Sequence, residues 1–360
     1  MNYRTRYFIY GALFGFCFPV ISSILDVLIQ GLPFTIDSIK QVQHTQPLHW
    51  VIDSAPLFLG LFAMLAGIKQ DEVMQMNQNL EQKVQDRTRD LHEKNSELSL
   101  AQKDLSKSLE KISQSIDYAQ RIQLALISNA EQMKTDFPGS FFLFRPRDVV
   151  SGDFLWYHKS NGYIYIAAVD CTGHGVPGAF MSLIGYCLLN KITSENKHAG
   201  TAEILDTIHI EIQKTLNQKR DSEVHDGMEM ALCRIDTKQK TIDFSGAGMG
   251  LCYISANGDM KEVKADFFSL GGFHFKPGFK YSTQTIPYQT GDRIYMFSDG
   301  ITDQFNANDE KFGLTRLRKN MAANYTKPSA EQEKAFSVEI DNWKKSARQL
   351  DDMMLVGVAV

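Results

Sequence analysis

The hydrophobic residues at the start of the chain are gathered into two long runs. Residues 7–25 form 19 consecutive uncharged positions, and residues 50–68 form a second run of similar length that contains Asp53. As helices, such runs extend about 28 Å, close to the roughly 30 Å hydrocarbon core of a bilayer. The pattern predicts two membrane-spanning helices, over about 7–27 and 50–68, in a hairpin segment 1–69. The alternative is a pair of buried helices in a soluble core.

The charges that flank the two runs predict their orientation. Arg4 and Arg6 precede the first run, Lys69 follows the second, and the connection between them carries Asp37 and Lys40. Basic residues tend to stay on the cytoplasmic side of a membrane. We therefore expect a multi-pass protein of the bacterial inner membrane, with both ends of the hairpin and the rest of the chain in the cytoplasm.

Residues 70–127 contain neither Gly nor Pro, and their apolar residues recur mostly in steps of three, four or seven. That spacing is the seam of a coiled coil. Polar residues at intervening seam positions weaken the pairing, which favours a signalling helix in a homodimer over a passive spacer. The apolar seam residues are Leu80, Val84, Leu91, Leu98, Leu105, Leu109, Ile112 and Ile116.

The remaining segment, residues 128–360, has the alternating pattern of a globular domain. Short apolar strands follow one another through turns, and two apolar stretches have the length and periodicity of helices. This order favours an α+β fold, a β-sandwich flanked by helices, over a parallel doubly wound sheet. The expected strands are 162–170, 228–236, 241–246, 250–255, 292–300 and 353–360, and the expected helices are 178–192 and 201–216.

Composition excludes some classes of protein. The net charge of −4 gives no argument for nucleic-acid binding, and we expect none. The five cysteines are scattered without a C-x-x-C pair. A disulfide framework or a structural zinc site is therefore not expected, and a reducing compartment fits best.

Acidic residues border several of the apolar strands. A single Asp beside Gly is usually a turn residue. Here the acids adjoin four strongly apolar strands, so strands that lie side by side would bring the carboxylates to one edge of the sheet. Oxygen ligands of this kind suit Mg²⁺ or Mn²⁺ rather than zinc or copper. The acids are Asp153, Asp170, Asp299 and the pair Asp351 and Asp352.

The turn AVDCTGHGVPG after Asp170 excludes three other chemistries. A cysteine phosphatase would need an arginine six residues after Cys171, where Pro177 stands. There is no G-K-[ST] sequence for a phosphate-binding loop, and no second His or Cys nearby for zinc. An acid that bridges metal ions is the interpretation that remains.

Five motifs together resemble those of one protein family. They come in the order seen in metal-dependent serine/threonine phosphatases of the type 2C (PPM) class, and they look like the sporulation stage II E (SpoIIE) branch. The resemblance covers residues from about 130 to 360. The segment FSGAGMGLCYI matches the family pattern only loosely, which leaves the substrate less defined. The motifs are VVSGDFLW, AVDCTGHGVPGAFMSLIG, DGMEMALCRID, GDRIYMFSDGITDQF and LDDMMLVGVAV.

The resemblance implies a β-sandwich with two Mn²⁺ or Mg²⁺ ions and a metal-activated water. Asp170 would bridge the ions, and the Cys171 backbone carbonyl would be a further ligand. His174 would protonate the leaving seryl oxygen or, equally, hold the turn. Asp153, Asp299 and one of Asp351 and Asp352, with Asp351 favoured, would complete the ligand set.

The leading hypothesis is a membrane-anchored phosphoprotein phosphatase controlled through its coiled coil. The resemblance implies a phosphoserine substrate in an anti-sigma-factor antagonist of the STAS type, within a partner-switching pathway. One alternative is a non-catalytic receptor that binds and sequesters a phosphoprotein. A sensor histidine kinase fits less well, because no ATP lid follows the helix. A further hypothesis is that the helix ending near Ile127 repositions the VVSGDF segment and thereby Asp153.

Overall fold

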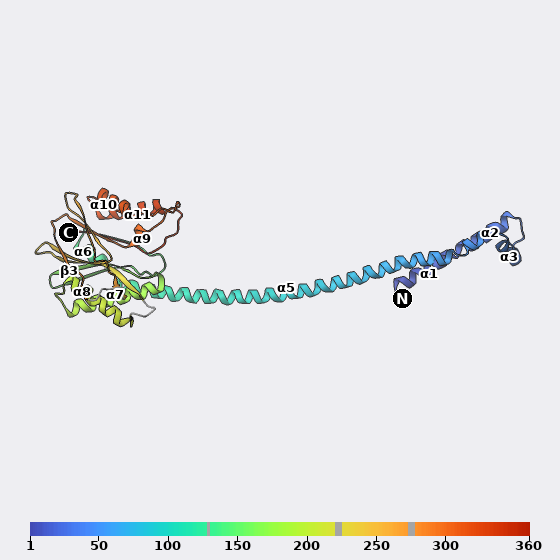
Figure 1. The fold of residues 1–360 in the computed structure, drawn as a ribbon, viewed down its shortest axis with the longest axis horizontal. Helices are drawn as coiled ribbons and strands as arrows, with labels where there is room; N and C mark the ends of the chain where they lie inside the picture. Colours follow the sequence, from blue (N-terminus) through green and yellow to red (C-terminus); the bar gives the residue numbers. More distant parts are fainter. Residues whose placement is uncertain (128–129, 220–224, 273–277) are drawn as a thin grey trace. The chain divides into compact units, whose positions relative to one another are not determined.

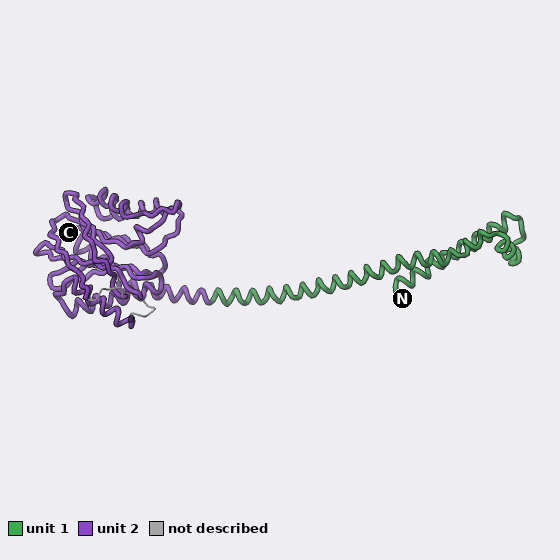
Figure 2. Tube along the Cα trace, in the orientation of Figure 1, with its two compact units in different colours: residues 1–107 green, residues 108–360 purple. Residues whose placement is uncertain are grey.

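The computed structural model describes residues 1–127, 130–219, 225–272 and 278–360. The chain forms two compact units, Met1–Lys107 and Ser108–Val360 (Figure 2). One helix, α5 (Ala55–Ile127), begins in the first unit and ends in the second. The predicted boundaries at 69/70 and 127/128 lie within and at the end of this helix, and as functional boundaries they stay predictions.

The first unit is made of helices. Two of its helices are long and apolar enough to cross a membrane by length and composition alone, one over Tyr3–Ile29 and one that begins at Leu48. Large apolar side chains point outward from both, among them Phe14 and Phe62, which are 62% and 69% exposed. The helices of this unit are α1 (Tyr3–Gly15), α2 (Cys17–Ile29), α3 (Ile36–Thr45), α4 (Leu48–Ile52) and the first part of α5.

Glycines let α1 pack closely against the start of α5. A Cβ atom at Gly11 would lie 2.5 Å from the Leu59 carbonyl oxygen, and one at Gly15 would lie 2.4 Å from the Pro56 Cα. Small residues at such positions allow two helix backbones to approach. The two helices therefore make direct backbone contact along one side.

The second unit is built on two antiparallel sheets (Figure 1). The register runs without a break along the long central strands, as in the pairing of Tyr163–Cys171 with Met228–Asp236. The first sheet has the order β1 (Phe141–Arg145), β11 (Met353–Ala359), β10 (Arg293–Phe297), β6 (Leu251–Ile254) and β7 (Met260–Val263). The second has the order β2 (Phe154–Ser160), β3 (Tyr163–Cys171), β4 (Gly227–Asp236), β5 (Thr241–Ala247) and β9 (Gln284–Pro287), and β8 (Leu270–Gly271) also pairs with β4.

The long strands are apolar on both faces because both faces are covered. Along β3, Ile164, Ile166 and Ala168 lie in the core between the sheets, whereas Tyr165 and Ala167 pack in the core under the helices. Successive side chains of a strand point to opposite faces. Asp170, two residues after Ala168, therefore lies on the face that looks toward the other sheet.

Helices cover the outer face of each sheet (Figure 1). Residues of α7 and α8 pack in one core with β3 and β4, and residues of α10 and α11 pack in another with β1, β10 and β11. The α+β prediction with sheets flanked by helices is confirmed for this unit. The helices are α6 (Ala130–Asp136), α7 (Gly175–Glu195), α8 (Thr201–Thr215), α9 (Asp299–Thr302), α10 (Leu314–Asn324) and α11 (Ser329–Lys344).

Candidate metal centre

The acids singled out from the sequence come together at one end of the sandwich. Asp170 is the second-last residue of β3 and interacts electrostatically with Asp299, Asp351 and Glu229. Asp153, which precedes β2, interacts with Asp170 and Asp352. The acids therefore form one connected group.

Burial and mutual repulsion raise the pKa values of these acids. Burial, followed by the charges of Asp299, Asp351 and Glu229, raises the pKa of Asp170 to about 7. The pKa of Asp153 is raised well above its usual range by burial and by Asp170. Burial also raises the pKa values of Asp299 and Glu229. A bound cation would remove both penalties by favouring the ionised carboxylates.

The donor atoms fit a hard divalent cation. The Asp153 side chain is 3% exposed, and its Oδ2 atom is buried without a hydrogen-bond partner among the described residues. Across the described ranges, no three His, Cys, Asp or Glu side chains are close enough to enclose an ion by themselves. Mg²⁺ retains several waters and uses one or two carboxylates, so a partly open ring of oxygens suits it.

The loop that carries Asp153 packs directly on the turn that follows Asp170. A Cβ atom at Gly152 would lie 2.8 Å from the Gly173 carbonyl oxygen and 3.1 Å from that of Cys171. Only glycine fits such an approach without displacing backbone. Burial raises the pKa of the Cys171 thiol, so this sulfur is a poor nucleophile.

The two neighbouring acids before β11 occupy different positions. Asp352 is 3% exposed, and its two carboxylate oxygens accept hydrogen bonds from the Arg147 amide at 2.6 Å and the Gly152 amide at 2.8 Å. Asp351 is exposed and accepts one bond from the Asp352 amide at 2.8 Å. Asp352 therefore anchors the 147–152 loop, and Asp351 retains acceptor capacity.

His174 is the N-cap residue of α7 and bonds across to the same loop. Its Nδ1 atom lies 2.8 Å from Asp148 Oδ2, and both side chains are partly exposed, at 44% and 41%. Sequence reasoning missed Asp148, because a loop acid has no periodic or spacing signal. The contact leaves Nε2 of His174 as the ring atom not engaged by Asp148.

The end of α5 also holds the loop. Gln123 donates from Nε2 to the Ser151 carbonyl at 2.6 Å and to the Ser182 hydroxyl at 2.8 Å, and its Oε1 accepts from the Ser151 amide at 3.2 Å. One helical turn earlier, Gln120 donates to the Val149 carbonyl at 2.7 Å. Sequence reasoning missed both glutamines, because neither residue interrupts the helical pattern.

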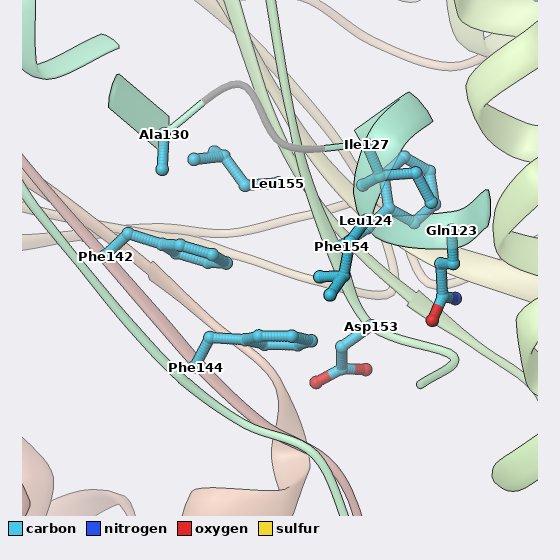
Figure 3. Close-up of a pocket in the computed structure, with 9 residues that line it drawn as sticks. All are labelled: Gln123, Leu124, Ile127, Ala130, Phe142, Phe144, Asp153, Phe154 and Leu155. Atoms are coloured by element: carbon cyan, nitrogen blue, oxygen red, sulfur yellow. The ribbon is translucent and has the colours of Figure 1, made fainter. Parts of the chain in front are cut away.

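A pocket of about 150 Å³ separates the end of α5 from β1 and from the start of β2 (Figure 3). Its wall is mostly apolar, with the Gln123 amide and the Asp153 carboxylate on one side (Figure 3). The helix end and this acid therefore border the same space. The lining residues are Gln123, Leu124, Ile127, Ala130, Phe142, Phe144, Asp153, Phe154 and Leu155.

Other charged residues near the motifs have ordinary structural partners. Arg145 makes a two-pronged contact with Asp341 of α11, at 2.7 and 2.8 Å, as a structural salt bridge would. Asp303 pairs with Lys311 at 2.7 Å. These contacts account for the orientation of both side chains. After burial, the charge of Asp303 also raises the pKa of Asp299, so Asp303 adjoins the acid group.

The fold and the acid group define a class of protein, the PP2C-type phosphatase domain. The family model described as stage II sporulation protein E matches residues 160–360, and the chain belongs to this SpoIIE family. The SiaA-PP2C domain of Pseudomonas aeruginosa is similar, with a TM-score of 0.64 and 26% identity over 70% of this chain and 98% of that one.

A second similar structure contains the PP2C phosphatase domain and a regulatory-domain fragment of SpoIIE from Bacillus subtilis. Its TM-score is 0.51 at 20% identity, and the match covers 61% of each chain. At this identity the likeness supports the fold alone. No curated protein matches the chain at a significant level.

Proposed function

We propose that this chain is a membrane-anchored protein serine/threonine phosphatase that depends on Mn²⁺ or Mg²⁺ and acts in bacterial signal transduction. The observation that carries the proposal is the buried, unpartnered Oδ2 atom of Asp153 beside Asp170, at the open end of a PP2C-type sandwich. A buried carboxylate oxygen without a donor is costly unless a cation binds it. Family membership supplies the reaction class.

The proposed metal ligands are the carboxylates of Asp153, Asp170, Asp299 and Asp351, with the Cys171 carbonyl oxygen. These residues would hold a pair of divalent ions, which would supply an activated water and neutralise the charge on phosphoryl oxygens. Asp352 serves as the anchor of the 147–152 loop, because both its oxygens already accept backbone amides. These contacts support Asp351 as the ligand of the pair.

We assign His174 to proton transfer at the leaving seryl oxygen, through Nε2. The contact between its Nδ1 atom and Asp148 supports this assignment, because a carboxylate at Nδ1 fixes the ring orientation and the tautomer. The same contact also joins the 147–152 loop to the turn before α7. Holding the turn and moving the proton are therefore compatible roles of one side chain.

Membrane anchoring and dimerisation complete the proposal. Outward-facing apolar side chains along α1, α2 and the start of α5 support a hairpin in the inner membrane, with the phosphatase domain in the cytoplasm. The apolar seam residues of α5 are exposed on the single chain, as with Leu91 at 64% and Leu98 at 69%. Pairing with a second copy through a coiled coil would bury them.

The proposed substrate is a phosphorylated protein, and an anti-sigma-factor antagonist of the STAS type remains the specific candidate implied by the family. A second possibility is a non-catalytic receptor that sequesters such a protein. The complete acid group favours the enzyme, because binding alone does not require the buried carboxylates.

The test is phosphate release by the full-length chain in detergent, with p-nitrophenyl phosphate and a phosphoserine peptide. We expect turnover that depends on Mn²⁺ and is lost in Asp170→Asn. Asp259→Asn, an exposed acid in the turn between β6 and β7, is the matched control and should retain activity. Phosphopeptide binding without any turnover in the wild type would instead identify a receptor.

A further inference from the structure

Phe267 is the most exposed large apolar side chain in the part of the chain that the structure describes, at 90%. The residue before it is nevertheless firmly held. The neighbouring Asp266 accepts from the Gly248 amide at 2.9 Å through its carbonyl and donates to the Gly246 carbonyl at 2.9 Å. The Asp266 carboxylate accepts from the Ser282 amide at 2.7 Å. The ring is therefore presented to solvent by an ordered segment.

Aromatic contacts support this segment from behind. The Phe267 ring meets Phe268 edge to face, with centroids 5.6 Å apart, and Phe268 meets Phe279 in the same way at 4.9 Å. The Tyr281 hydroxyl donates to the carbonyls of Phe268 and Ser269 at 3.3 and 3.2 Å. A ring held in this way loses little conformational freedom when a partner covers it, as is typical of aromatic residues that dominate interfaces.

The sheet register places Phe267 in line with the metal centre. Asp170 on β3 is directly opposite Glu229 on β4. The Glu229 carboxyl carbon would lie 2.6 Å from a Cβ atom at Gly248, the residue that follows β5. Ala247 in turn forms a parallel bridge with Asp266. One transverse row therefore runs from Asp170 through Glu229 and Gly248 to Phe267.

The length of this row follows from strand spacing. Neighbouring strands lie about 4.8 Å apart, so three such steps place Phe267 roughly 14 Å from Asp170. An extended polypeptide covers about 3.3–3.6 Å per residue. A peptide that runs along the row from Asp170 would bring its fourth residue, approximately, to the Phe267 ring.

We propose that Phe267 is a substrate-docking residue that contacts an apolar side chain about four residues from the phosphoserine of a protein substrate. The proposal rests on the phosphatase function proposed above and adds a specificity element to it. The ring offers an apolar face without a charge, so leucine, isoleucine, methionine or an aromatic residue is the side chain it selects. Phe267 lies in one row with Asp170 and Glu229 of the acid group, which favours a substrate over a second copy of this chain as the partner that covers the ring.

The experiment uses the full-length chain in detergent with Mn²⁺ and a set of phosphoserine peptides. Each peptide carries one leucine, moved stepwise along both sides of the phosphoserine in a Gly-Ser-Lys background. We expect the highest kcat/KM when the leucine is about four residues away on one side. Phe267→Ser should raise KM for that peptide about tenfold with kcat retained, and Phe267→Leu should restore most of the preference.

Phe180→Ser is the matched control, since Phe180 is also strongly exposed, at 65%, but lies on α7. It should leave the leucine preference unchanged. A wild-type chain without a leucine preference, or a preference that survives Phe267→Ser, would overturn the docking role. If Phe267→Ser changed only the mass of the oligomer, the ring would serve self-association, and this result would also overturn the docking role.

Turnover of p-nitrophenyl phosphate separates the two levels of the proposal, because this substrate has no flanking residues. Its failure in the wild type would contradict the phosphatase function, whereas its success without a leucine preference would contradict docking alone. Where turnover is absent, binding of the same peptides in fluorescence anisotropy gives the same comparison. Equal affinities for the wild type and Phe267→Ser would overturn the docking role.

Discussion

Replacing Gln123 with leucine would separate the end of α5 from the loop that carries Asp153. The Gln123 side chain is 7% exposed and makes hydrogen bonds to both backbone groups of Ser151 and to the Ser182 hydroxyl. Leucine has a similar size and keeps the apolar packing against α7. The change therefore removes polar contacts while leaving the volume nearly filled.

The magnitude follows from what is left without a partner. Ser151 is 1% exposed, so its N–H and C=O groups would both lose their bonds in a buried position. Each such group costs about 1–3 kcal/mol, whereas Ser182 keeps its bond to the Ala179 carbonyl. The loop should lose roughly 2–6 kcal/mol of local stability. Because Asp153 is two residues further along, we expect Mn²⁺ affinity to fall at least about tenfold.

The assay is a calorimetric Mn²⁺ titration of the full-length chain, with phosphate release measured in parallel. Gln120→Leu is the matched control, because this glutamine is one turn earlier and makes a single exposed bond, to Val149. It should change Mn²⁺ affinity by less than about twofold. Unchanged Mn²⁺ affinity and turnover in Gln123→Leu would refute the view that the helix end positions the loop.

Three further predictions concern the acids and their loop. Asp351→Asn should abolish Mn²⁺ binding in calorimetry with little loss of stability. Asp352→Asn should destabilise the fold by about 1–3 kcal/mol in urea unfolding, because an amide nitrogen cannot accept a hydrogen bond from a loop N–H group. The reverse pattern would exchange the two roles. Gly152→Ala should weaken Mn²⁺ binding and lower the Tm, because its Cβ would lie 2.8 Å from a backbone oxygen of the next turn; an unchanged Tm would contradict this steric argument. Burial raises the pKa of Asp170 to about 7 in the folded chain, whereas the unfolded chain releases this proton near pH 4. The free energy of unfolding of the metal-free protein should therefore fall by up to roughly 4 kcal/mol as the pH rises from about 4 to 7. Thermal unfolding across this range should show the decline without metal and its suppression by Mn²⁺, and a metal-free Tm that rises with pH would contradict it.

The strands that carry the candidate ligands could be predicted from the sequence because their signals are local. The apolar runs before Asp170 and Asp299 and after Asp352 are strands in the structure, and each acid stands where its strand begins or ends. Hydrophobic periodicity and turn residues suffice for such elements. The same signals identified α7 and α8 but not α10 and α11, which cover the other sheet.

The contacts that organise the site could not be predicted, because they join residues far apart in the chain. Nothing local distinguishes Asp351 from Asp352, and only the amides of the 147–152 loop separate their roles. Gln123 has the sequence context of any polar helix residue, yet it holds Ser151. Glu229 lies in the DGMEMALCRID motif, but nothing in that motif marks it as part of the site, and it joins the acid group through the register of β3 with β4.

The close glycine contacts in the N-terminal hairpin restrict how that segment can move. Gly11 and Gly15 of α1 lie against the backbone of early α5. A larger distance between the two helices would therefore leave a gap, because glycine has no side chain to fill it. Sliding along the contact, or turning as a pair, preserves it. The movements of α1 that keep this contact with early α5 are therefore a slide along the helix axis and a joint rotation, and a bulky residue at Gly11 would force the two helices apart.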